Sequence, residues 1–560
     1  MKSTSEFRRI TLTLACIIAV LAGAAALSAP LLLPRLFFLR QDSLVLAGLL
    51  GLLFGARGRP AFAWSRRLPA VRLDYRTVAA GAGAAALLLW AGTYLLFDNY
   101  PLTRDEHMVV FDMAVFRSGR LAAPLPPEWR AYAAALTPDF LFHLPGNAAW
   151  VSSYMPVNAM LRTLFGMIAD PALMNPVLAA AGAVATFDCA RRLFPKSGGA
   201  QAVALLMYAT SAQVLALAMT NYAMTGHLAL NMIWLSLYLR GTRASHGGAI
   251  GIGFLAIGLH QIVFHPLFAL PFIDHLRRQG QWRTAAVYCG CYALFGLFWI
   301  SYPHLVALSA GLQTQTGMSG GGGFITNRVL PLLLHRDHRT VQLMVVNLLR
   351  FVTWENLALL PLLALSFGAI RRDEGIARPL AYGIILTILA MAFLLPYQGH
   401  GWGYRYLHGL IGNCALLAAW GWRDHCDRDE VRGFVRTASL ATVFGSIPFL
   451  MWQAAAFVRP YAQADRTIGR INANMVVINA DYSDFRVDQV RNLPDLTNRP
   501  IRLASYWLTP ADIRMLCSRG TIAFADPGPM DLHDLGVDRV PSSNKFDALR
   551  AAAPVQCLRR

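Results

Sequence analysis

Charged residues are scarce in this chain. Asp, Glu, Lys and Arg make up 14% of the 560 residues, against roughly 25% in an average soluble domain. Counted along the sequence, only three residues are lysines and only six are glutamates. A soluble enzyme would carry its apolar residues in helical stripes, whereas here 56% of residues are hydrophobic and solid apolar runs recur as far as residue 457. Runs of about 17 to 25 apolar residues are long enough to cross a bilayer. The sequence therefore predicts a polytopic membrane protein.

Several motifs that would point to other functions are missing. The eight cysteines have no metal-site spacing, and Gly320–Gly323 lacks the Lys-Ser/Thr that completes a phosphate-binding loop. No internal repeat of the kind found in secondary transporters is visible. The formal net charge is +19, but the basic residues lie mostly in short loops between apolar runs. Such loops determine membrane topology, so nucleic-acid binding is the poorer interpretation.

Basic loops predict the topology. The densest basic cluster follows the second apolar run and is expected on the cytoplasmic side: Arg57, Arg59, Arg66, Arg67, Arg72 and Arg76. The block 248–276 is flanked by basic residues on both sides, so we divide it near Val263 into two short spans. This gives thirteen spans, with the N-terminus inside and the C-terminus outside: about 11–30, 38–56, 77–97, 173–190, 199–218, 225–240, two within 248–276, 284–303, 354–370, 379–396, 405–422 and 434–457.

The topology divides the chain into a multi-span domain, 1–457, and a soluble extracytoplasmic domain, 458–560. The composition of the segment 458–560 is that of an ordinary soluble protein, and the apolar runs Met475–Ile478 and Thr521–Phe524 predict a small α/β fold there. Two further segments are expected outside: a first large loop with a juxtamembrane helix, 98–172, and a flexible loop, 304–353. The fold class is thus an all-α polytopic membrane protein with a small C-terminal α/β domain.

Thr103-Arg104-Asp105-Glu106 directly follows the third span and opens an amphipathic run that ends at Gly119. Thr103 and Glu106 have the spacing of a capping box, in which each side chain binds the backbone N–H of the other. That role does not explain Asp105. A carboxylate in the first turn of a helix is favoured in its ionised form, which suits a group that accepts a proton.

The acidic pair, the helix ending at Gly119 and Pro124 resemble the first outer loop of GT-C superfamily glycosyltransferases. The resemblance is greatest to the branch with protein O-mannosyltransferases and the lipid A aminoarabinose transferase. Tyr154-Met155-Pro156 is similar to the Tyr-Pro-Pro element of that branch. Two features depart from the pattern. Two spans precede the usual first one, and Val157 replaces the second proline.

The resemblance implies an enzyme of the bacterial inner membrane and cell envelope that takes part in lipopolysaccharide or polysaccharide biosynthesis. Such enzymes move a sugar from a polyprenyl phosphate to a hydroxyl of a lipid, glycan or protein on the outer face. Phosphate is already a good leaving group, whereas the acceptor hydroxyl benefits from a carboxylate base. Asp105 is the expected base, with Glu106 as an orienting partner or cap, and direct attack would invert the anomeric centre.

The departing phosphate needs cations at the membrane surface. The stretch 397–408 contains Arg405, whose rigid guanidinium suits phosphate, together with three glycines that allow close backbone approach. The topology places this stretch on the outer face, where an interfacial belt would explain its aromatic residues. A belt does not explain Arg405, because the positive-inside rule disfavours arginine on the outer side. We therefore predict Arg405, His400 and Tyr404 as donor-phosphate ligands, with His304 as a fourth candidate.

Other ionisable residues carry weaker predictions. His260 and His265 flank the expected turn between the two short spans, and Glu355 opens the span at 354–370; ionisable residues at membrane depth are functional candidates. His143 and Glu128 lie in the first outer loop without the spacing of metal ligands. No metal site is predicted, and the need for a divalent cation is left open.

Two alternative functions remain at this stage. A transporter or flippase of a lipid-linked sugar would place polar contacts near the midplane, whereas the polar groups here gather towards the outer face. An O-antigen polymerase or ligase would share the compartment, but such enzymes use arginines in large loops and lack an acidic pair at the end of a span. Cys517 and Cys557 are the only cysteines of the tail. In an oxidising compartment they should form a disulfide that closes a loop of about forty residues.

Overall fold

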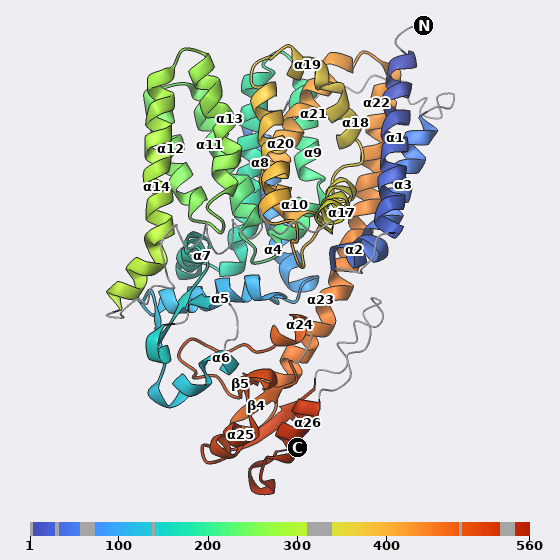
Figure 1. Cartoon of the computed structure of the whole chain (residues 1–560). Helices are drawn as coiled ribbons and strands as arrows, with labels where there is room; N and C mark the ends of the chain where they lie inside the picture. The colour runs from blue at the N-terminus through green and yellow to red at the C-terminus, as the bar shows by residue number, and fades with distance from the viewer. Residues whose placement is uncertain are drawn as a thin grey trace.

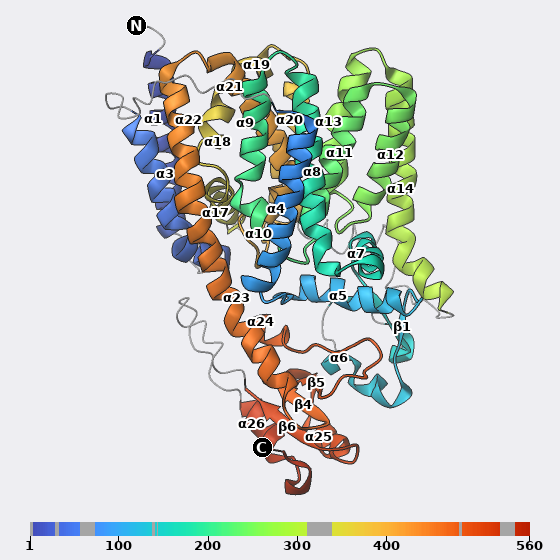
Figure 2. The ribbon, with the colours of Figure 1, turned by 180° about the vertical axis from the view of Figure 1, so that it is seen from behind.

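The structure is a computed structural model that describes residues 4–27, 33–56, 73–136, 140–142, 144–310, 339–480, 484–526 and 544–559. Most helices run side by side in one bundle, and a small domain lies beyond one end of that bundle (Figures 1 and 2). Helix α5 (Arg104–Arg117) lies across this end, roughly perpendicular to the bundle helices. We call this end of the bundle the α5 face.

The bundle is built from apolar helices. Within the described ranges, seven helical segments are long and apolar enough to span a membrane, or nine if each of two bent pairs counts as one span. The chain is therefore a multi-pass membrane protein. The bundle helices are α1 (Thr4–Leu27), α2 (Leu33–Phe37), α3 (Ser43–Gly55), α4 (Tyr75–Leu95), α8 (Met174–Leu193), α9 (Gly198–Ala209), α10 (Ala212–Ala218), α11 (Met224–Arg240), α12 (Arg243–Ile257), α13 (Phe264–Arg278), α14 (Trp282–Ser309), α17 (Arg339–Trp354), α18 (Leu359–Leu365), α19 (Phe367–Arg371), α20 (Ala377–Leu394), α21 (Ile411–His425), α22 (Asp429–Ala441) and α23 (Ile447–Gly469).

The span count is lower than the predicted thirteen when helix length is the criterion. Each predicted segment coincides with a helix or a broken helix, and α12 and α13 are separated at 258–263, where the division near Val263 was expected. However, α11, α12, α13 and α21 have only 15 to 17 residues. A helix of that length reaches little more than 25 Å, less than the apolar thickness of a typical bilayer.

The expected outer loop 304–353 is helical at both ends. Helix α14 continues through Pro303 to Ser309, and α17 begins at Arg339; the glycine run Gly320–Gly323 lies outside the described residues. The predicted span 354–370 corresponds to the segment Leu359–Arg371, and α17, which lies in the expected loop, meets this segment at an angle of 103°.

The segment after α5 forms a small antiparallel sheet and returns to the bundle. The sheet has the strand order β1-β3-β2, and it is followed by the amphipathic helix α7. The elements are β1 (Ala123–Pro124), α6 (Ala133–Leu136), β2 (Leu141–Phe142), β3 (Ala149–Ser152) and α7 (Val157–Ile168). Met108, Phe111 and Val115 of α5 pack in one apolar cluster with residues of this segment and of the C-terminal domain.

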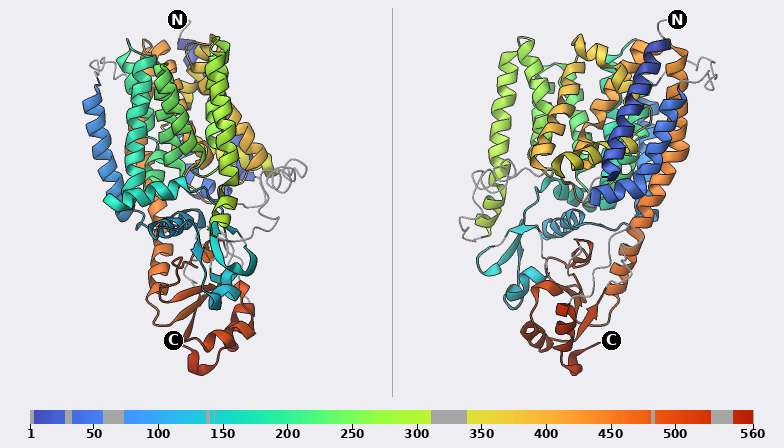
Figure 3. Two further views of the ribbon diagram at one scale, coloured as in Figure 1. Left: turned by 90° about the vertical axis from the view of Figure 1, so that its left-hand side faces the viewer. Right: turned by 45° about the vertical axis from the view of Figure 1, so that its right-hand side comes forward.

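The C-terminal domain is a small α/β unit, as the sequence predicted. Three parallel strands have the order β5-β4-β6, and a disulfide joins Cys517 to Cys557 as expected. Its elements are β4 (Met475–Ile478), α24 (Asp484–Val487), β5 (Ile501–Ala504), α25 (Pro510–Cys517), β6 (Ile522–Ala525) and α26 (Asn544–Ala551). The proposed boundary at residue 457 falls inside α23, which runs on to Gly469 and carries the domain below α5 (Figure 3).

Candidate functional site

The start of α5 presents two adjacent carboxylates at the α5 face. Thr103 occupies the N-cap position with an extended backbone (φ −107°, ψ 165°), but its side chain makes no capping hydrogen bond. Its hydroxyl instead contacts the Tyr222 hydroxyl at 2.8 Å. The predicted capping box is therefore wrong in its Thr103 half. Asp105 and Glu106 occupy the first turn, where a helix stabilises negative charge.

Asp105 lies between Tyr154 and Arg405. Its Oδ1 accepts a hydrogen bond from the Tyr154 hydroxyl, and its Oδ2 pairs with Arg405 Nη1 at 2.5 Å. Burial tends to raise the pKa of Asp105, but the Arg405 guanidinium, His260 and these hydrogen bonds together hold that pKa below its usual value. Asp105 is thus a carboxylate at neutral pH, with its proton-accepting oxygens held by two donors.

Glu106 has a different environment from its neighbour. Its side chain is 2% exposed, and its Oε1 accepts a hydrogen bond from the backbone N–H of Asn221 at 2.9 Å. Burial raises the pKa of Glu106 to about 7, although the backbone hydrogen bonds oppose the shift. The acidic pair therefore consists of one ionised group and one that titrates near neutrality.

Arg405 is held by the loop that precedes it. Gln398 accepts from the Arg405 backbone N–H at 3.0 Å and from Nη2 through its own carbonyl at 2.5 Å, and its amide donates to the Gly403 carbonyl at 2.8 Å. Gly403 has φ +65°, and a Cβ there would lie 2.1 Å from Gln213 Oε1. Only glycine fits this turn. The guanidinium also lies over the Tyr222 ring, at 5.0 Å from its centroid.

Of the other three predicted phosphate ligands, His400 is connected to the Asp105–Arg405 pair through Tyr222. His400 is 5% exposed, and its Nδ1 contacts the Tyr222 hydroxyl at 3.4 Å. The ring of the same Tyr222 lies beneath the Arg405 guanidinium, so Tyr222 lies between the two side chains. Burial, followed by the charge of Arg405, lowers the pKa of His400 well below its usual value. Tyr404 is fully buried, with its hydroxyl 3.7 Å from the Met344 sulfur. His304 lies inside α14, and no described contact joins it to Asp105 or Arg405.

Two cavities meet at the Asp105–Arg405 pair. We call the first the carboxylate cavity; it is lined by Asp105, Val109, Asp112, Tyr154, Met155, Asn158, Ala159, Tyr222, Ala223, Leu259 and His260. We call the second the guanidinium cavity; it is lined by Met224, His227, Asn231, Phe264, Thr387, Arg405, Tyr406, Gly409 and Leu410. The ion pair thus separates a space bordered by carboxylates from one bordered by a cation.

Of the other histidines and glutamates considered from the sequence, His260 lies in the carboxylate cavity. The ring of His260 lies 5.3 Å from that of Tyr154 in the carboxylate cavity, and burial lowers its pKa to about 4. His265 is held by Asn231 and Tyr292, each at 2.8 Å, as a structural histidine would be. Glu355 is buried at the break between α17 and α18, away from either cavity. Glu128 is exposed in the short helix Pro127–Tyr132, and His143 lies outside the described residues.

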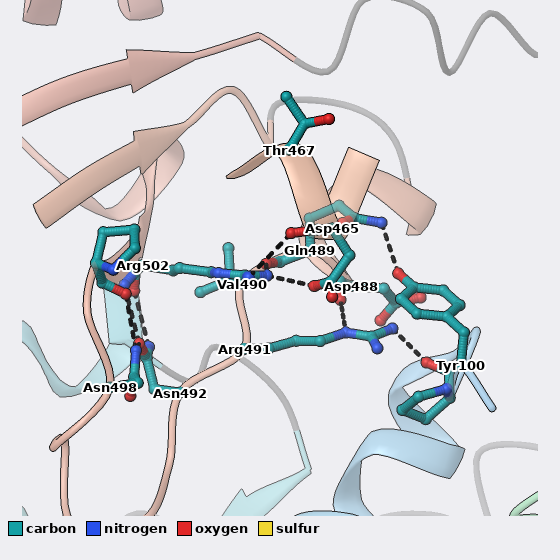
Figure 4. Close-up of polar contacts among 12 residues, drawn as sticks. Tyr100, Asp465, Thr467, Asp488, Gln489, Val490, Arg491, Asn492, Asn498 and Arg502 are labelled. Atoms are coloured by element: carbon teal, nitrogen blue, oxygen red, sulfur yellow. Dashed lines mark hydrogen bonds and ion pairs between the residues drawn. The ribbon is translucent and has the colours of Figure 1, made fainter. Parts of the chain in front are cut away.

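The C-terminal domain anchors the start of α5. Arg491 donates to the carbonyl of Pro101, and Gln489 donates to the Tyr100 hydroxyl at 2.7 Å (Figure 4). From the other direction, Arg104 donates to the carbonyls of Val487 and Val490 at 2.6 and 3.1 Å. The residue next to Asp105 is therefore fixed to a domain almost 400 positions later in the chain.

The two additional N-terminal spans anchor the opposite side of the site. Asp42 of the first pair of spans forms an ion pair with Arg350 of α17 at 2.8 Å, and neither side chain is exposed. Arg350 Nη2 also donates to the carbonyl of Gly401 at 2.9 Å. Gly401 belongs to the loop that presents Arg405. Asp42 therefore helps, through Arg350, to hold the Arg405 guanidinium in place.

Sequence reasoning missed Tyr154, Asn221 and Tyr222 as site residues. Tyr154 was noticed only as part of a motif, although its hydroxyl binds Asp105 directly. Asn221 and Tyr222 interrupt an apolar stretch between two spans that the topology turns towards the outer face. A polar pair at such a turn is a signal that could have identified them. Among the described residues, no three His, Cys, Asp or Glu side chains gather as a metal site would require.

Comparison with solved structures finds membrane-bound transferases. The chain is similar to ArnT, the lipid A aminoarabinose transferase, from Cupriavidus metallidurans bound to undecaprenyl phosphate, with 13% identity, 74% of this chain and 84% of that chain covered, and a TM-score of 0.48. It is also similar to the oligosaccharyltransferase of Archaeoglobus fulgidus, with 11% identity, 73% and 64% covered, and a TM-score of 0.41. Neither a protein-family model nor a curated protein matches the sequence. At this low similarity, the activity has to be argued from the residues of the site.

Proposed function

We propose that the protein is an inverting glycosyltransferase that moves a sugar from a polyprenyl phosphate donor to a hydroxyl of a lipid, glycan or protein acceptor. The observation that supports this most strongly is the Asp105–Arg405 ion pair between two cavities. It places a proton acceptor beside a rigid, phosphate-compatible cation at the α5 face. These are the two groups that such a transfer needs.

The donor and the acceptor would approach the pair from opposite sides. The donor phosphate binds the Arg405 guanidinium, which then shares its charge between the phosphate and Asp105. The acceptor hydroxyl enters the carboxylate cavity and donates its proton to Asp105. As its oxygen bonds to the anomeric carbon, the bond from that carbon to the phosphate oxygen breaks, and the phosphate leaves with the electron pair next to Arg405. Attack from the face opposite the phosphate inverts the anomeric centre.

Binding of the donor would also activate the base. In the structure, both oxygens of Asp105 accept hydrogen bonds, one from Tyr154 and one from Arg405. A phosphate that draws the guanidinium towards itself would release the Oδ2 atom, so that the carboxylate becomes free to accept a proton only when donor is present. Glu106 then holds the turn at Asn221 rather than taking part in proton transfer.

The positions of the arginines support an extracytoplasmic active site. At the end of the bundle opposite the α5 face, the helix ends and the loops that join them are rich in arginine: Arg191, Arg192, Arg240, Arg243, Arg277, Arg278, Arg371, Arg372, Arg423 and Arg428. Basic loops mark the cytoplasmic side. The α5 face and the disulfide-bonded domain would therefore lie in the periplasm of a bacterial inner membrane, with the N-terminus in the cytoplasm.

The test is sugar transfer by purified Asp105→Asn protein, with the lipid donor and an acceptor mixture from the cell envelope. Asparagine keeps the shape of the side chain but cannot take the proton, so transfer should fall by at least about 100-fold. Glu106→Gln is the matched control, because it removes the adjacent carboxylate while keeping an acceptor oxygen, and it should reduce transfer much less. Equal transfer by Asp105→Asn and the wild type would remove Asp105 from the mechanism.

A further inference from the structure

The guanidinium cavity contains several polar atoms that have no partner. Within the described part of the chain, both ring nitrogens of His227, the hydroxyl of Thr387 and the Nε atom of Arg405 are buried and make no hydrogen bond. These side chains are only 3%, 2% and 7% exposed, and all three line the same cavity. They come from α11, from α20 and from the short helix Arg405–Leu410, so they gather there only in the folded chain.

Other buried side chains of the described residues, such as Trp234 and Asn413, also have an atom without a partner, but here three residues with such atoms line one cavity. Leaving a buried donor or acceptor unsatisfied costs its full desolvation free energy, and the few that native structures retain call for an explanation. Asn231 in the same cavity shows the contrast, because its amide binds the Gly409 carbonyl at 2.9 Å and its oxygen binds His265 at 2.8 Å. The unpartnered atoms of His227, Thr387 and Arg405 are therefore available to something that enters the cavity.

The lining indicates the chemistry of the occupant. Among the described residues that line the cavity, Arg405 is the only charged one, and none is a carboxylate that could balance an ammonium group. His227 and Thr387 can each donate and accept hydrogen bonds, as the hydroxyls of a sugar require. Phe264 and Tyr406 add aromatic faces, and the Phe264 ring packs against His227 at 5.3 Å. The carboxylate cavity, lined by Asp105 and Asp112, has the opposite character.

We infer that the guanidinium cavity binds the sugar of the donor, and that this sugar is an uncharged, hydroxyl-bearing one rather than an amino sugar. His227 and Thr387 bind its hydroxyls while Arg405 binds the adjoining phosphate. The inference rests on the proposed function and adds the substrate class to it. A single ordered water bound to the same atoms is the competing occupant, and it would leave the affinity for the sugar unaffected.

Binding of three lipids to the full-length protein tests the inference. The probes are undecaprenyl phosphate, the same lipid carrying glucose, and the same lipid carrying aminoarabinose. Thr387→Val keeps the volume of the side chain and removes only the hydroxyl, so the Kd for the glucosyl lipid should rise roughly two- to tenfold, the worth of one hydrogen bond. The Kd for undecaprenyl phosphate alone should not change. His227→Phe should give a larger rise with the same selectivity.

Thr186→Val is the matched control. Thr186 is equally buried, but its hydroxyl binds the Gly182 carbonyl at 2.8 Å and it does not line the cavity. All three of its affinities should stay at wild-type values. The wild type should also bind the glucosyl lipid more tightly than the aminoarabinosyl lipid, because the ammonium group finds no counter-charge.

The outcomes separate the two proposals. If the wild type binds the lipids but Thr387→Val leaves the glucosyl Kd unchanged, or raises the Kd for the bare lipid equally, the cavity does not hold the sugar and a bound water explains the polar atoms. Tighter binding of the aminoarabinosyl lipid would overturn the substrate class. If the wild type binds none of the three lipids, the proposed function itself fails.

Discussion

The buried ion pair between Asp42 and Arg350 makes a strong and measurable prediction. Asp42 also accepts a hydrogen bond from the Trp354 indole at 2.7 Å, so both of its oxygens are occupied. Asp42→Asn retains the shape of the side chain but leaves the guanidinium of Arg350 buried without a counter-charge. The expected result is a destabilised bundle whose Arg405 loop is less firmly held.

The magnitude follows from the burial of the pair. Removing one partner of a buried ion pair costs about 3–5 kcal/mol, whereas an exposed pair contributes about 0–1 kcal/mol. Both members here are 0% exposed. The pair Arg432–Asp429 provides the matched control, since its aspartate is 73% exposed. Asp429→Asn should therefore change the free energy of unfolding by less than about 1 kcal/mol.

A double variant separates stability from positioning. Asp42→Asn combined with Arg350→Met removes both charges, and replacing a buried pair by apolar groups is often neutral. Most of the stability should return, but the hydrogen bond from Arg350 to the Gly401 carbonyl remains lost. Sugar transfer by the double variant should then stay below the wild-type rate although the protein is stable.

Unfolding in detergent, followed by tryptophan fluorescence, measures the first effect, and a transfer assay below the unfolding midpoint measures the second. The reasoning is refuted if Asp42→Asn destabilises the protein no more than Asp429→Asn does. Full recovery of transfer in the double variant would show that the ion pair acts on stability alone and does not position the Arg405 loop.

Two further predictions concern pH and topology. Burial raises the pKa of Asp112 from 3.8 to about 7. Between these pH values the folded state retains a proton that the unfolded chain releases, so the free energy of unfolding falls as pH rises. Thermal melts across that range should show a shallower fall for Asp112→Asn than for the wild type. Trp507 lies between β5 and α25 of the C-terminal domain and is 53% exposed, whereas Trp282 begins α14, shortly after the arginines that end α13, and is 62% exposed. In a cysteine-depleted background, Trp507→Cys should react with an impermeant thiol reagent added outside intact cells and Trp282→Cys should not, and the reverse pattern would overturn the proposed orientation.

The features that could be predicted from sequence are those determined by local pattern. Apolar runs located the helices and two of the three C-terminal strands, β4 and β6, because such runs depend on residues close together in the chain. The strand β5 was not predicted. The Cys517–Cys557 disulfide was predictable for another reason: only two cysteines lie in the tail, so compartment and number left a single pairing. The basic loops likewise predicted which ends of the helices gather together.

What escaped prediction depends on contacts between distant segments. Asp105 and Arg405 were proposed separately, as base and phosphate ligand, but nothing in the sequence shows that they pair across 300 positions. The bend between α17 and α18 has no local signal, since it is stabilised by contacts such as Asn356 with Thr210 at 2.8 Å. Tyr404 adjoins Arg405 in sequence, yet its side chain packs towards Met344. Adjacent loop residues point in different directions, which composition alone cannot reveal.

The geometry of the site depends on two anchors that share no residues. Asp105 is positioned by α5, which the C-terminal domain holds through Arg104 and Arg491. Arg405 is positioned by its loop, which the N-terminal spans hold through Arg350. Residues that share no partners usually contribute additively to stability, so damage to one anchor should leave the other intact. The distance between carboxylate and guanidinium depends on both, however. Loss of either anchor should therefore reduce sugar transfer, because the proposed mechanism places the two groups on either side of the same reacting bond.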